Sequence, residues 1–174
     1  MQKFIKIKPI IDYSVRGLCK LSYSGNTKGC PNFNHKEGCP PSALFFDKVF
    51  DMNKSIFVIY NKYDLKGFAD KMRTKHPGIS KKQAECCLYW QNTARKSLTK
   101  KVITFLSCHE NYFVCMAPYR GIEKDLGKYK DNVIFSPPEA MGVSLTLTMK
   151  TIGIELEWPP ENVTYQIAIA ALKI

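Results

Sequence analysis

Strand-like and helix-like segments alternate along this 174-residue chain, and the alternation limits the folds that it can adopt. Runs rich in β-branched and aromatic residues, or with apolar residues at every second position, predict strands at residues 3–8, 55–63, 112–117, 154–158 and 164–172. The last two are expected to form a hairpin. Because helical patterns separate the other strands, we expect an α/β or α+β sandwich, with a single mixed β-sheet packed by helices, in one domain spanning residues 1–174.

Two of the predicted helices lie in the middle of the chain. The first runs from Asp64 to Lys75 and stops before a His-Pro-Gly sequence, which disfavours further helix. The second is a long basic amphipathic helix over residues 80–106, in which Ser80 and Gln83 form a capping box. Its apolar stripe consists of Ala84, Cys87, Leu88, Ala94, Leu98, Val102 and Phe105.

A third helix start is marked by the sequence Ser-Pro-Pro-Glu. Ser136 is the expected N-cap, Pro137 occupies the first helical position, and Glu139 completes a capping box. Gly153 is placed to end this helix. Residues 136–174 are therefore predicted to be a helix followed by the C-terminal strands.

The composition is that of an ordinary globular protein, with 45% hydrophobic and 24% charged residues. No run of about 18 apolar residues predicts a membrane helix, and the N-terminus lacks the apolar core of a signal peptide. We therefore expect a cytoplasmic protein without a membrane partner.

A formal net charge of +11 favours nucleic acid or another polyanion as a partner. The candidate nucleic-acid-binding residues in the long helix are Arg95, Lys96, Lys100 and Lys101. The alternative is a solvated, lysine-rich surface with no such role.

The cysteines between residues 16 and 41 point to a metal-binding loop near the N-terminus. Cys30 and Cys39 each lie in a Gly-Cys-Pro unit, and Cys19 precedes them in the same polar segment. Glycine permits a tight bend around a metal, and proline fixes φ. In a chain without a signal peptide, such thiols are more often metal ligands or buried apolar groups than disulfides.

The spacing favours an iron–sulfur cluster over zinc. Structural zinc sites usually have paired ligands two to four residues apart, which this loop lacks, whereas a proline after a ligand cysteine is frequent in iron–sulfur proteins. Zinc remains the alternative, with His35 as a further ligand. A fourth ligand from outside the loop is predicted at Cys108, with Cys115 as the alternative; Cys115 is otherwise expected to pack in a strand.

These patterns predict a metal-binding protein that most simply carries an iron–sulfur cluster, with redox chemistry or nucleic-acid modification as fitting roles. The alternative is a zinc-stabilised basic module that binds nucleic acid or a protein partner without catalysis. No nucleophile elbow, phosphate loop or dinucleotide fingerprint is present, so the sequence indicates no particular reaction.

Two segments, CPNFNHKEGCPP and SPPEAMGVSLTLTMKTIGIELEWPP, resemble an uncharacterised family of predicted metal-binding proteins. That family has a Cys-x4-Cys-x8-Cys-Pro-Pro motif, to which Cys30, Cys39 and the two prolines after Cys39 correspond. The family's first cysteine falls at Gly25, so Cys19 takes its place only if the loop carries an insertion. The resemblance implies metal binding and names no reaction.

Overall fold

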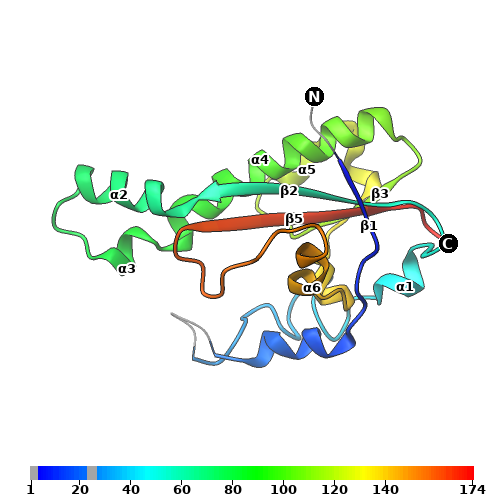
Figure 1. Ribbon diagram of the computed structural model, residues 1–174, viewed down its shortest axis with the longest axis horizontal. Helices are drawn as coiled ribbons and strands as arrows, with labels where there is room; N and C mark the ends of the chain where they lie inside the picture. Colours follow the sequence, from blue (N-terminus) through cyan, green and yellow to red (C-terminus); the bar gives the residue numbers. More distant parts are fainter. Residues whose placement is uncertain (1–3, 23–26) are drawn as a thin grey trace.

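A five-stranded mixed β-sheet organises the chain in the computed structural model, which describes residues 4–22 and 27–174 (Figure 1). The strands are β1 (Ile5–Ile7), β2 (Ile56–Asp64), β3 (Phe113–Cys115), β4 (Val133–Ile134) and β5 (Val163–Ala171). Their order across the sheet is β1-β2-β5-β3-β4, with β3 and β4 parallel and the other neighbours antiparallel. The predicted single mixed sheet packed by helices is confirmed, in its α+β form.

Helices and turns cover both faces of this sheet. The α-helices are α1 (Phe46–Val49), α2 (Leu65–Lys75), α3 (Lys81–Ala84), α4 (Cys87–Cys108), α5 (Ile122–Leu126) and α6 (Leu145–Lys150). The 3-10 helices are η1 (Tyr13–Lys20), η2 (Gly127–Asn132) and η3 (Pro138–Met141). In Figure 1, α4 and α5 lie on one side of the β2–β5 ribbon, and α6 and η1 lie on the other. None of the helices in the described ranges is long and apolar enough to span a bilayer.

The alternation of side chains along β5 produces two separate cores. Ile167 and Ile169 point to the side of α6 and pack in a cluster with Phe46 and Met149. Ala168 and its neighbour two residues on point to the opposite side, where small side chains let α4 approach the sheet. The cysteine-rich segment lies on the α6 side, so the sheet separates it from most of α4.

The long basic helix predicted over residues 80–106 is two helices. The predicted Ser80–Gln83 capping box is confirmed, but it caps only the four-residue α3. The chain then leaves the helical conformation at Cys86, and α4 begins at the next residue. The buried indole of Trp90 donates its N–H to the carbonyl oxygen of Glu85 at 3.0 Å, so this carbonyl is bonded to a side chain at the break.

This break also changes the predicted apolar stripe. Cys87 and Leu88 were expected in it but are exposed in the first turn of α4. The remaining members are buried as predicted: Ala84, Ala94, Leu98, Val102 and Phe105.

The predicted helix start at Ser136 is wrong, because its side chain has a long-range partner. Ser136 Oγ donates a hydrogen bond to the carbonyl oxygen of Gly38 at 2.6 Å, so it does not cap a helix. Only the short η3 follows, and it ends at Gly142, which has a φ of +86°. The chain becomes helical again in α6, after Ser144.

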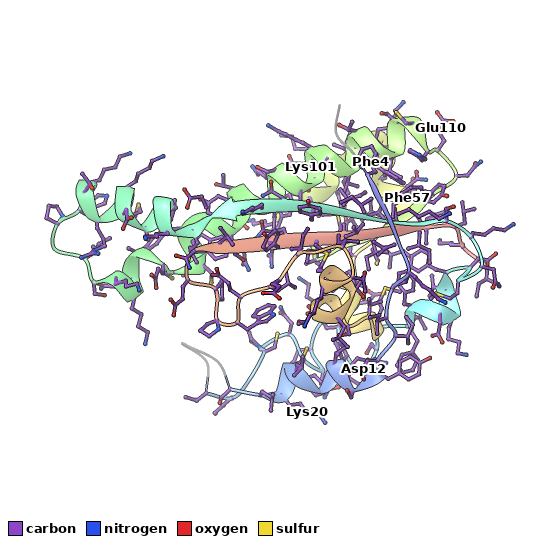
Figure 2. The ribbon with its side chains drawn as sticks, in the orientation of Figure 1. Phe4, Asp12, Lys20, Phe57, Lys101 and Glu110 are labelled. Atoms are coloured by element: carbon purple, nitrogen blue, oxygen red, sulfur yellow. The ribbon has the colours of Figure 1, made fainter. Side chains whose placement is uncertain are left out.

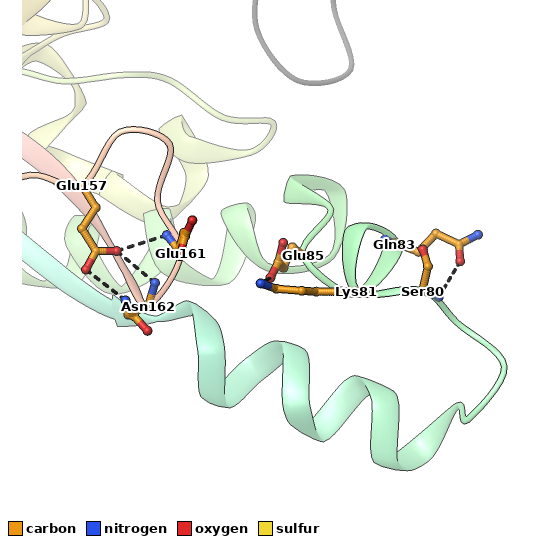
Figure 3. A network of polar contacts seen from close by, with 7 residues as sticks. All are labelled: Ser80, Lys81, Gln83, Glu85, Glu157, Glu161 and Asn162. Atoms are coloured by element: carbon orange, nitrogen blue, oxygen red, sulfur yellow. Dashed lines mark hydrogen bonds and ion pairs between the residues drawn. The ribbon is translucent and has the colours of Figure 1, made fainter.

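The C-terminal hairpin is also wrong, since residues 154–158 form no strand. β5 pairs instead with β2 along its length and with β3 at its C-terminal end. The segment before β5 is held by the Glu157 carboxylate, which accepts hydrogen bonds from the main-chain N–H groups of Glu161 and Asn162 at 3.1 and 2.9 Å (Figure 3). These local bonds fold residues 157–162 into a turn.

Candidate metal centre and adjoining cavity

Cys19 and Cys30 are joined through their main chains. Cys19 lies in the last turns of η1, and was wrongly predicted in a loop without regular structure. The N–H of Cys30 donates a hydrogen bond to the carbonyl oxygen of Cys19 at 2.8 Å. Gly29 makes this approach feasible: its φ is +81°, and an added Cβ would lie 2.7 Å from the same carbonyl oxygen. The first Gly-Cys-Pro unit thus brings Cys30 next to Cys19.

The second Gly-Cys-Pro unit repeats this geometry against another part of the chain. Gly38 has a φ of +80°, and an added Cβ would collide with the carbonyl oxygen of Phe135. The Ser136 hydroxyl donates to the Gly38 carbonyl, as described above. Cys39 N–H donates to the carbonyl oxygen of Lys36 at 3.1 Å, which closes a turn. The loop is therefore attached to the segment that leads into η3.

The three loop thiols lie close enough to influence one another electrostatically. Burial raises the pKa of Cys19, and the charges of Cys30, Cys39 and Glu139 raise it further, while that of Arg16 lowers it. Burial also raises the pKa of Cys39, and the charge of Cys30 adds to this effect. Negative groups that repel each other in this way are stabilised together by a bound cation.

Glu139 is one of the negative groups that act on Cys19, although its sequence pattern predicted only a helix-capping role. It is half-buried, and burial raises the pKa of its carboxyl to about 6. Its signal in the sequence was its place in the Pro-Pro-Glu segment of the family resemblance. The contact between that segment and the loop, through Ser136 and Gly38, is a tertiary feature that spacing along the chain does not reveal.

The chemistry of the donors suits a thiophilic metal, since three thiols and a carboxylate are supplied by η1, the two glycine turns and η3. The side chains are not yet in a coordinating arrangement: among residues 4–22 and 27–174, no three His, Cys, Asp or Glu side chains converge tightly enough to hold an ion. His35 is exposed and lines a surface depression together with Cys19 and Cys30. The position of the family's first cysteine, Gly25, lies outside the described residues.

The two cysteines predicted to supply a fourth ligand are not brought to the loop. Cys108 is exposed at the end of α4, on the side of the sheet away from the loop. Figure 2 shows this separation, with Glu110 near that end of α4 and Lys20, next to Cys19, on the opposite side of the sheet. Cys115 is fully buried in β3, in the same core as Phe46, as expected for a packed strand cysteine.

A cavity of about 540 Å³ adjoins the loop at Cys30. Its other walls come from the N-terminal half of α4, η3, residues 156–160 and the first half of β5. Three of its lining residues are charged: Arg95 from α4, Glu139 from η3 and Glu157 from the segment before β5. Both tryptophans of the chain, Trp90 and Trp158, also line it. The cavity therefore combines a large apolar surface with few polar groups, as small-molecule sites do.

The four candidate nucleic-acid-binding residues do not form one exposed surface. Lys96 and Lys100 are exposed on α4. Lys101 is half-buried, and its Nζ donates to the carbonyl oxygen of Tyr60 at 2.9 Å. Arg95 faces the cavity and donates from Nη1 to the carbonyl oxygen of Pro118 at 3.3 Å. Two of the four groups thus have partners within the protein.

Comparison with known proteins identifies the family. No curated protein and no solved structure gave a significant match. The model of a family described as predicted metal-binding protein (DUF2284) matches residues 10–172, which include the cysteine loop, η3 and the cavity walls. This agrees with the resemblance seen in the sequence, and the chain belongs to the DUF2284 family of predicted metal-binding proteins.

Proposed function

We propose that the chain binds an iron–sulfur cluster through Cys19, Cys30 and Cys39. The main support is the hydrogen bond between Cys30 N–H and the Cys19 carbonyl, which holds two of the three thiols together around a glycine that has no room for a side chain. The match to a family of predicted metal-binding proteins supports metal binding in general. The family match does not distinguish iron from zinc.

The identity of the ligand atoms favours iron–sulfur chemistry. Thiolates are the usual ligands of such clusters, and both Cys30 and Cys39 are followed by proline. We assign the fourth position to Glu139, because it lines the same cavity as Cys30 and its charge raises the pKa of Cys19. A cluster with one non-cysteine ligand supplies electron transfer or a Lewis-acidic iron.

The protein's own groups would position and protect this cluster. Arg16 donates from Nη2 to the carbonyl oxygens of Pro41 and Ala43 at 2.8 and 3.0 Å, which ties η1 to the end of the loop. Its positive charge also offsets part of the repulsion at Cys19. All seven cysteines are free thiols, so Cys19, Cys30 and Cys39 are available as ligands.

Anaerobic purification tests the proposal directly. We expect a brown protein with broad visible absorbance that contains iron and acid-labile sulfide, and little zinc. A colourless protein with one zinc would show the zinc-stabilised module instead. Protein that takes up neither metal, even after reconstitution with iron and sulfide or with zinc, would exclude both.

Matched cysteine variants locate the site. Replacing Cys30 and Cys39 together with serine should abolish the visible band and the bound iron. Replacing the two exposed cysteines of α4, Cys87 and Cys108, should leave both unchanged. Glu139→Gln should keep the iron but change the electron paramagnetic resonance spectrum of the reduced protein, and an unchanged spectrum would remove Glu139 from the ligand set.

A further inference from the structure

The cavity beside the loop follows an unpaired edge of the sheet. Five consecutive β5 residues, Val163–Ile167, line it. Successive strand residues point to opposite faces, so a wall that includes all five is the edge of the strand. On this edge of β5, β3 pairs with Ile169–Ala171 only. Among the described residues, no strand pairs with the part of the edge that precedes Ile169. Main-chain N–H and C=O groups are therefore available along one side of the cavity.

Arg95, in the wall formed by α4, is a cation without a counter-ion among the described residues. Arg95 is half-buried, and its only hydrogen bond among the described residues is the long one to the Pro118 carbonyl. No carboxylate pairs with it in the described part of the chain. Burial lowers the pKa of Arg95, which nevertheless stays protonated, as arginine does in proteins. A partly buried guanidinium with free donors is suited to a carboxylate, whose two oxygens match its fork.

The remaining walls set the character of the rest of the ligand. Both tryptophans line the cavity: Trp90 is buried, whereas Trp158 is 68% exposed. Leu98, Leu145 and Ile167 add aliphatic surface. Glu139 and Glu157 supply negative charges at other points of the wall, which disfavours a ligand with several negative charges.

We propose that this cavity binds an organic carboxylate with an apolar or aromatic body, its carboxylate on Arg95 and its body against Trp158. The cavity shares Cys30 and Glu139 with the proposed metal site, whereas Arg95 and Trp158, which hold the ligand in this proposal, belong to the cavity alone. The volume of about 540 Å³ lies within the range of small-molecule sites.

The two tryptophans make the test simple, because both line the cavity and no others occur in the chain. The wild-type protein is titrated with phenylacetate, neutral phenylacetamide and phenyl phosphate while tryptophan fluorescence is recorded. We expect saturable quenching by phenylacetate, with an affinity at least about tenfold higher than that for phenylacetamide. Phenyl phosphate, whose charge approaches −2, should bind more weakly than phenylacetate. Equal affinities for acid and amide, or no saturable change with either, would refute the proposal.

Arginine variants then test the anchor. Arg95→Gln should weaken phenylacetate binding at least about tenfold and leave phenylacetamide binding unchanged. Arg73→Gln is the matched control, because Arg73 is exposed on α2 and lies outside the cavity; it should bind like the wild type. Equal weakening by the two variants would contradict a specific role for Arg95. If Arg95→Gln does not fold, the acid–amide comparison in the wild type still decides the question.

The same titration separates this proposal from the metal site. It is performed on the protein as isolated and again after metal removal with a chelator. Acid-selective binding by a protein that takes up no metal, even on reconstitution, would refute the proposed function alone, and metal binding without acid selectivity would refute the cavity proposal alone.

Discussion

The N–H of Cys30 donates a 2.8 Å hydrogen bond to the carbonyl oxygen of Cys19, so main-chain atoms hold these two residues side by side. A site whose ligands are already near one another loses less conformational entropy when the metal binds. This relationship makes Gly29, which permits the approach, a sensitive position.

Gly29→Ala should destabilise the folded protein by about 1–3 kcal/mol, because alanine is strained at a φ of +81° and its Cβ would meet the Cys19 carbonyl. Thermal unfolding of the metal-free protein measures this. Gly17→Ala is the control: Gly17 has no atom within 4 Å of an added Cβ, so the change should stay within about 1 kcal/mol. Equal melting temperatures for the two variants would contradict the strained loop.

Glu157→Gln should make the stability of the turn before β5 less dependent on pH. Hydrogen bonds from Asn162 and Glu161 lower the pKa of Glu157 in the folded protein below its ordinary value of 4.5. A group with a lowered folded pKa stabilises the protein above its unfolded pKa, and this stabilisation is lost as pH falls through the folded value. The variant should therefore melt below the wild type at about pH 7 and approach it at about pH 3. Glu155→Gln, at an exposed position in the same segment, should show no such convergence.

Cys115 should resist thiol reagents in the folded protein. It is fully buried, and burial raises its pKa to about 12, so almost no thiolate forms at about pH 8. Treatment with iodoacetamide followed by peptide mass spectrometry should show modified Cys87 and Cys108, which are exposed, and unmodified Cys115. Unfolding in guanidinium should make all three reactive. Modification of Cys115 at the rate of Cys108 under native conditions would contradict its place in the core.

Nucleic-acid binding through α4 remains a prediction, and it rests on the two exposed lysines. If Lys96 and Lys100 each contact one phosphate, replacing both with glutamine should reduce the slope of log K against log salt by about 1.8 for duplex DNA. Fluorescence anisotropy at several salt concentrations measures this slope. If the variant and the wild type have the same slope, Lys96 and Lys100 do not contact phosphates and belong to a solvated, lysine-rich surface.

The local patterns of the sequence predicted the elements that depend on local forces. The strand at residues 55–63, the helix that starts at Asp64 and the Ser80–Gln83 box are all present, because each rests on neighbours in the chain. The failures have long-range causes. The side chain of Ser136 bonds to Gly38, about a hundred residues away, and so does not cap a helix.

The candidate site shows the same division. The glycine turns around Cys30 and Cys39 were predicted from the Gly-Cys-Pro repeat, and both glycines have positive φ. Glu139 and Arg95 reach the cavity only because η3 and α4 pack near the loop and the β5 edge, and no spacing in the sequence encodes that arrangement.

The position of β5 has a consequence for how the chain folds. This strand is the last element of the chain, yet it lies at the centre of the sheet between β2 and β3. During synthesis, β2 and β3 cannot join one sheet before β5 is available, because each pairs with β5 and they do not pair with each other. The sheet is therefore complete only after Ala171 has left the ribosome, and until then β2 and β3 each have an unpaired edge that is open to non-native pairing.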